Sequence, residues 1–130
     1  MRKLLLLVAV MAFAQILVAQ NDRETIARQR ANDLFEAFTS LPVDDREAYI
    51  LHQYSKALLE KYDMSMHTNM LDRLSEDFGE SEMGDITINA RGFNMMIRRK
   101  DDGHKVKFVV YLDKNAPYLI AGYEIDAGEL

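Results

Sequence analysis

The feature of this 130-residue chain that most constrains its fold is a change of hydrophobic period at Gly84. Before Gly84, apolar residues recur every three or four positions, which is the spacing of amphipathic helices. After it, apolar residues alternate with polar ones, as in strands that bury one face, and no helical pattern returns. Helices followed by strands predict an α+β domain in which the helices cover one face of an antiparallel sheet.

Three helices are expected, together covering about residues 23–79. Asn21 and Glu24 have the spacing of an N-cap and its returning acid, which predicts a first helix over about residues 23–39. Asp44 and Glu47 repeat that spacing at the start of a second helix that fades near residues 61–63. The residues that this second helix should bury are Ala48, Leu51, Tyr54 and Leu58.

The third helix is expected to end at Gly79 in a left-handed conformation. Its predicted inner residues are Met70, Leu71, Leu74 and Phe78. Four strands should then form an antiparallel meander over about residues 85–126. Asp101-Asp102-Gly103 marks a hairpin in it, because Asp and Gly tolerate the positive φ of such turns.

The first 19 residues read as a signal peptide, with basic Arg2 and Lys3 before an apolar block that ends in small residues. Cleavage is expected after Ala19, with Ala14 as the alternative. An uncleaved anchor also remains open, because the block approaches the length that spans a bilayer. The signal peptide predicts export to the periplasm or the extracellular space. The rest of the chain, residues 20–130, is expected to form a single domain, since about 110 residues are too few for two domains.

The composition and net charge argue against disulfides, a lipid attachment and two classes of partner. There is no cysteine, so neither a disulfide framework nor a lipid attachment is available. Loss of Arg2 and Lys3 leaves 14 basic against 21 acidic residues, a net charge of −7 in place of −5. Such a surface repels nucleic acid and anionic lipid, so no nucleic-acid partner is expected, nor a membrane contact beyond the signal peptide.

No constellation of side chains indicates catalysis, a metal or a cofactor. His52, His67 and His104 lack metal-ligand spacing, and the first two are expected on helix surfaces and the third in a turn. The adjacent acids Asp44-Asp45 and Asp101-Asp102 are explained by capping and turn formation. An enzymatic role is therefore not predicted, although the sequence alone does not decide it.

The two faces of the last hairpin differ in character. One face should pack on the helices through Val106, Phe108, Val110 and Leu112, matched by Leu119, Ala121, Tyr123 and Ile125. The opposite face has an apolar centre at Val109, Tyr111 and Ile120, which is either solvated or a contact surface. Eight methionines suit either core packing or an adaptable apolar groove.

Several motifs carry a resemblance: Leu74…Phe78-Gly79, the charged turn, VKFVVYLD and the closing YLIAGYEID. They resemble the small N-terminal module that precedes the catalytic domain in some bacterial exported serine hydrolases and peptidases, over about residues 23–126. The resemblance implies a cystatin-like, NTF2-like fold, here expected to stand alone. Ser-x-x-Lys and Gly-x-Ser-x-Gly motifs are absent, so it implies no catalytic residue.

Two functions follow as hypotheses. The first is an exported, non-enzymatic accessory or interaction module that acts through protein contacts, with a homodimer through its sheet as one form. The alternative is a small-molecule-binding or enzymatic NTF2-like domain with a pocket between helices and sheet. In that pocket Tyr54, Arg98 and Tyr123 would supply the polar groups.

Overall fold

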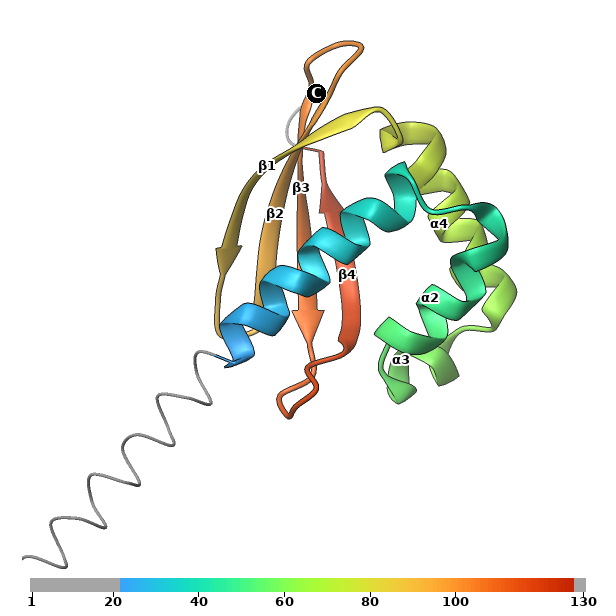
Figure 1. Cartoon of the computed structure of the whole chain (residues 1–130), viewed down its shortest axis with the longest axis vertical. Coiled ribbons are helices and arrows are strands. Elements are labelled where there is room, and N and C mark those ends of the chain that lie inside the picture. Colours follow the sequence, from blue (N-terminus) through green and yellow to red (C-terminus); the bar gives the residue numbers. More distant parts are fainter. Residues whose placement is uncertain (1–21, 128–130) are drawn as a thin grey trace, which may run out of the picture.

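The computed structural model describes residues 22–127, so the expected signal peptide lies outside the described part (Figure 1). A long helix occupies residues 22–39. It is followed by η1 (Val43–Asp45), α2 (Arg46–Gln53), α3 (Lys56–Lys61), α4 (Met64–Phe78), β1 (Ser81–Ile88), β2 (Gly92–Arg99), β3 (Lys105–Leu112) and β4 (Ile120–Asp126). The predicted α+β class, with helices before an antiparallel sheet, is confirmed. No helix within residues 22–127 has the length and apolar character needed to cross a membrane.

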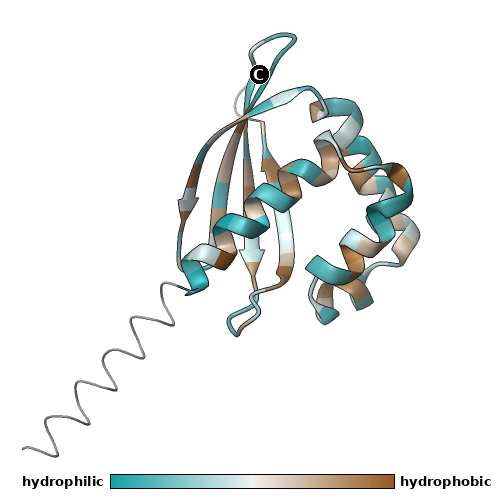
Figure 2. Ribbon diagram, in the orientation of Figure 1, coloured by the Kyte–Doolittle hydropathy of each residue, from teal (hydrophilic) through white to brown (hydrophobic). Residues whose placement is uncertain are grey.

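The sheet is a simple meander with the strand order β1-β2-β3-β4, and each neighbouring pair is antiparallel. The long helix crosses one face of this sheet, whereas α2, α3 and α4 form a second group beside β4 (Figure 1). Polar and apolar residues alternate along the helices, as expected when one side of each helix faces the core (Figure 2). The inner sheet face is thus covered from two directions.

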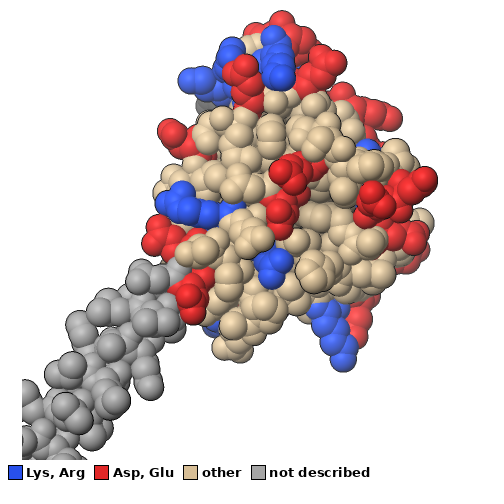
Figure 3. Space-filling model, viewed as in Figure 1, with Lys and Arg blue, Asp and Glu red and all other residues tan. Residues whose placement is uncertain are grey.

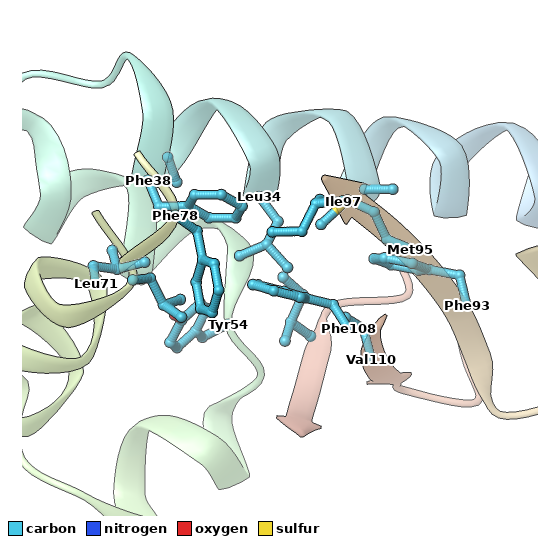
Figure 4. Packing of buried hydrophobic residues seen from close by; sticks show 14 of the residues in the cluster. Leu34, Phe38, Tyr54, Leu71, Phe78, Phe93, Met95, Ile97, Phe108 and Val110 are labelled. Atoms are coloured by element: carbon cyan, nitrogen blue, oxygen red, sulfur yellow. The ribbon is translucent and has the colours of Figure 1, made fainter. Parts of the chain in front are cut away.

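An aromatic cluster joins the two groups of helices to the sheet. Phe38 of the long helix stacks on Phe108 of β3 at 5.3 Å between ring centroids, and Phe78 of α4 meets the same ring edge-on at 5.7 Å. Figure 4 shows these rings converging from different elements, with Tyr54 beside them. Aromatic pairs at such distances stabilise beyond their buried area.

The predicted second helix is interrupted at Tyr54 and Ser55. The Ser55 backbone N–H donates to the Ile120 carbonyl at 2.8 Å, and Tyr54 forms an isolated parallel bridge with the same residue. The Ser55 hydroxyl then accepts from the Leu58 N–H at 3.2 Å and caps α3. One continuous helix was therefore the wrong prediction, because pairing with β4 extends the backbone at this point.

The break changes which residues are buried. Tyr54 and Leu58 are buried as predicted, whereas Leu51 is 61% exposed and Ile50 takes the inner position of α2. Ala48 is exposed as well.

Helix α4 also departs in part from its predicted pattern. Leu71, Leu74 and Phe78 are buried, but Met70 is 41% exposed. Gly79 has φ −62°, so the helix does not end in the left-handed conformation that was expected.

A β-bulge at Ala121 reverses the predicted faces of the start of β4. Tyr111 pairs with Gly122 but Leu112 pairs with Ile120, which leaves Ala121 as an extra residue. Because side chains alternate with a period of two, one extra residue moves Ile120 to the inner face. Ile120 is fully buried and Ala121 is exposed, so the prediction that Ile120 lies on the outer face is wrong.

The β3 prediction is confirmed, since its four inner residues are all buried. They are Val106, Phe108, Val110 and Leu112.

We predict that Gly92→Ala destabilises the fold by at least about 2 kcal/mol, the cost of a strained backbone conformation plus a clash. Gly92 has φ +159°, and an added Cβ would lie 2.1 Å from the Val110 carbonyl oxygen. Gly122→Ala is the matched control, because its Cβ would meet only the Tyr111 ring, at 3.9 Å. Urea denaturation measures both, and equal losses would contradict this account of Gly92.

Candidate binding groove

A groove of about 330 Å³ opens between the second group of helices and the edge of the sheet. Its lining comes from α3, from the start of α4 and from β4. The lining residues are Leu58, Lys61, Tyr62, Met66, His67, Met70, Ala121, Gly122 and Tyr123. The hydrogen bond from Ser55 to Ile120 joins the start of α3 to the start of β4. The helix wall and the β4 wall of the groove extend from this junction. The volume is at the lower end of the roughly 300–1,000 Å³ usual for ligand sites.

The rim of the groove is apolar and exposed. Tyr62, Met66 and Met70 are 41%, 53% and 41% exposed, and they are three of the six large hydrophobic side chains that the described residues expose. Met66 and Met70 are one turn apart on α4, so they project on the same side. Thioether side chains adapt to irregular partners, which favours the adaptable-groove interpretation for these two methionines.

His67 forms part of the groove floor rather than the helix surface that was predicted for it. It is only 6% exposed, and its Nε2 lies 3.1 Å from the Leu58 carbonyl oxygen. Because a carbonyl only accepts, this nitrogen carries the proton. The imidazole ring meets Tyr54 and Tyr62 edge-on, at 5.3 Å and 6.0 Å. His67 therefore acts as a packed link between α3 and α4.

The three histidines are dispersed. His52 is exposed, as predicted. His104 follows the β2–β3 turn, with its Nε2 at 3.0 Å from the Ala127 carbonyl oxygen. Among residues 22–127 no three His, Asp or Glu side chains converge as metal ligands would.

Three tyrosines pack together at the groove, with Tyr123 in its lining and Tyr49 and Tyr54 behind it. Tyr54 meets Tyr49 at 6.1 Å and Tyr123 at 6.5 Å between ring centroids. The Tyr54 hydroxyl faces that of Tyr123, yet the pair does not reach hydrogen-bond geometry, and the described residues offer no partner to the buried hydroxyls of Tyr54 and Tyr49. Burial raises the pKa of all three phenols, so they are neutral in the folded protein.

A polar network connects this tyrosine cluster to the long helix. Arg30 donates to Gln53 Oε1 at 2.6 Å, and Gln53 Nε2 donates to Asp33 at 3.0 Å. Arg30 also donates to the carbonyl oxygens of Pro117 and Tyr118, at 2.9 Å and 3.2 Å. The Arg30 guanidinium thus ties the long helix to α2 and to the β3–β4 loop, which assigns it a structural role.

The predicted pocket residues are only partly brought together. Tyr54 and Tyr123 are in contact, but Arg98 lies on the outer sheet face, where it pairs with Glu82. Arg98 follows buried Ile97 in β2, so its side chain points away from the helices. The cation near the tyrosines is Arg30, which helical periodicity alone did not single out.

The outer sheet face retains two of the three predicted contact residues. Val109 and Tyr111 are half-buried there, together with Met96, whereas Ile120 belongs to the core. Tyr111 is flanked in register by Gly92 and Gly122. Tyr111 also lines two shallow hollows of about 280 and 300 Å³, which it shares with Ala90 and Arg91.

Charged side chains are unevenly distributed over the face that carries the long helix. Figure 3 shows both signs gathered at the tip of the β2–β3 hairpin, with large uncharged areas below it. At that tip Arg99 pairs with Asp101 and Asp102, at 3.1 Å and 3.7 Å. These exposed ion pairs contribute little to stability, and they place the charges away from the groove.

No protein-family model, curated protein or solved structure matches this chain. Its function is therefore argued from the chemistry of its own surfaces. The groove combines a concave volume with exposed apolar side chains, and it is the strongest candidate for a binding site among the described residues.

Tyr49, Tyr54 and Tyr123 should remain neutral at a pH at which free phenols ionise. Burial raises the pKa of these phenols in the folded protein above its value in the unfolded chain. Their contribution to the free energy of unfolding is therefore fully present below about pH 10 and is lost as the pH rises further. Substituting phenylalanine singly for Tyr49 and Tyr54, the two phenols whose pKa burial raises furthest, should leave the 295 nm absorbance of the folded protein at pH 11 unchanged. A decrease at 295 nm, with circular dichroism still native, would show that the substituted phenol ionises in the fold.

Proposed function

We propose that this chain is an exported binding module that acts through protein contacts, and that its groove receives an apolar segment of a partner protein. One observation carries the proposal: three of the six exposed large hydrophobic side chains of the described residues border a single groove. Exposed apolar residues that cluster beside a concavity mark interaction sites, whereas isolated ones need no explanation.

The chemistry of the groove favours a protein segment over a small molecule, which is the alternative function. A small-molecule site needs a few free polar groups that orient the ligand. Here the His67 Nε2 is bonded to Leu58, the hydroxyl of Tyr54 is buried outside the lining, and Arg98 is on the other face. Lys61 is the one charged group that the lining offers. An apolar side chain of a protein needs no such groups, because its own backbone fixes its position.

The resemblance supports an accessory role outside the cytoplasm. The helices and the antiparallel meander are compatible with a cystatin-like, NTF2-like module, and the first 19 residues have the order of a signal peptide. A module of this kind acts by holding another protein. Catalysis is not part of the proposal.

Met66→Asp should weaken partner binding about tenfold, the effect of losing an interface residue worth more than about 1 kcal/mol. A photo-crosslinking amino acid at position 66 first captures the partner in the exporting cell, and mass spectrometry identifies it. Affinity is then measured with the purified partner.

Leu51→Asp is the matched control, since Leu51 is an exposed apolar residue on α2 outside the groove. Equal effects of Met66→Asp and Leu51→Asp would remove the groove from the proposal.

Self-association through the outer sheet face is the second form of the proposal. It is favoured by the apolar centre formed by Met96, Val109 and Tyr111, on the sheet face opposite the long helix (Figure 1). Light scattering on the mature protein should then give the mass of a dimer, and Tyr111→Glu should give a monomer. Leu51→Glu, at an exposed position of α2 away from the sheet, should leave the dimer intact. A monomeric parent protein at high micromolar concentration would eliminate this form and leave the groove.

A further inference from the structure

We propose that the partner segment binds as an extended strand paired with the free edge of β4, and that it places an apolar side chain in the groove and an acidic one near Lys61. This inference rests on the proposed function and specifies how the groove is used. It predicts backbone hydrogen bonding as the source of affinity and the groove as the source of selectivity, which is the general behaviour of strand addition.

The edge of β4 is available along most of its length. β4 is the last strand of the sheet, so β3 is its only neighbouring strand within the described residues. On the other edge, the Ser55 N–H binds the Ile120 carbonyl and Tyr54 forms one parallel bridge. Ser55 then caps α3 and the chain turns away. The described part of the chain makes no further hydrogen bond to this edge between Ala121 and Ile125.

The two edge strands of the sheet differ in where their irregularity lies. In β1 the register shifts between Met83 and Ile86, and the irregular part exposes the Asp85 side chain. A bulge and a charge are devices by which proteins block unwanted strand pairing. In β4 the bulge is at Ala121, near the start of the strand, so the pairing from Gly122 to Ile125 is regular, and Ile125 is 37% exposed. The exposed charge of this part, Glu124, pairs in register with Val109 and so lies on the outer sheet face, away from the groove. Of the two edges, β4 is therefore the one suited to an added strand.

The same residues form the free edge and one wall of the groove. Ala121, Gly122 and Tyr123 line the groove opposite Met66 and Met70. In an added strand, alternate side chains point to the helix side of the sheet. A segment hydrogen-bonded to this part of β4 would thus direct every second side chain toward the methionine rim.

Lys61 determines the preferred charge of the segment. It is the one Lys, Arg, Asp or Glu among the nine residues that line the groove, in a chain with a net charge of −5. Its Nζ lies 5.4 Å from the centroid of the Tyr62 ring, which holds the ammonium group at the rim. An acidic residue next to the apolar anchor complements this site.

Selection from a phage-displayed library of random 12-residue peptides on the mature protein tests the inference. Enriched peptides should share an apolar residue near an acidic one. In synthetic versions of the tightest peptide, N-methylation at alternate residues should weaken binding on the order of tenfold through lost hydrogen bonds, while methylation of the intervening residues should have little effect. This period of two is specific to strand addition.

Lys61→Glu should weaken the same peptides about fivefold, the upper range for an exposed ion pair. Lys56→Glu is the matched control, because Lys56 lies on the same helix, has a 90% exposed side chain and does not line the groove. Equal losses in the two variants would overturn the acidic preference.

The outcomes separate the inference from the proposed function. Peptides that lose affinity with Met66→Asp but are insensitive to the position of N-methylation would overturn strand addition and leave the groove as a protein-binding site. Failure to obtain any peptide that depends on Met66 would overturn both. Amide protection of residues 121–125 that rises with protein concentration alone would show that a second copy occupies the edge, and would overturn the partner segment.

Discussion

The hydrogen bond from the Ser55 backbone to the Ile120 carbonyl determines how the second group of helices lies against the sheet. It extends the chain at Tyr54, ends α2 and allows the Ser55 hydroxyl to start α3 in a new direction. A single backbone bond contributes only about 0.5–1.5 kcal/mol. Its importance is geometric, because it sets where α3 and α4 lie relative to β4 and so creates the groove.

Two local irregularities meet at this junction and reinforce one another. The bulge at Ala121 turns Ile120 into the core, where it is fully buried. The same bulge leaves Tyr123 on the inner face beside Tyr54, whose backbone bridges to Ile120. The tyrosine cluster, the groove floor and the start of the free edge are therefore consequences of one junction between a helix break and a strand.

Sequence periodicity predicted well those elements whose burial follows one regular pattern. The long helix, the inner residues of β3 and three of the four inner residues of α4 agree with the structure. The site was predicted less completely. Tyr54 and Tyr123 were identified and do meet, but Arg98 lies on the other face, and the positions of Lys61 and His67 in the groove lining were missed. Both side chains are polar, and the part of the lining that comes from β4 is distant from them in sequence, so no local pattern indicates them.

Apolar periodicity is sufficient to predict the α+β class, the order of helices before strands and the face of β3 that meets the helices, because burial of apolar surface enforces a local period of 3.6 or 2. The break at Tyr54, the bulge at Ala121 and the groove between them arise from contacts between distant segments of the chain. At Tyr54 and Ser55 the local pattern is helical, and the hydrogen bond from Ser55 to Ile120, 65 positions further along the chain in β4, prevails over it. Such long-range pairing leaves no periodic signal, since it depends on one carbonyl being in reach after the chain has folded.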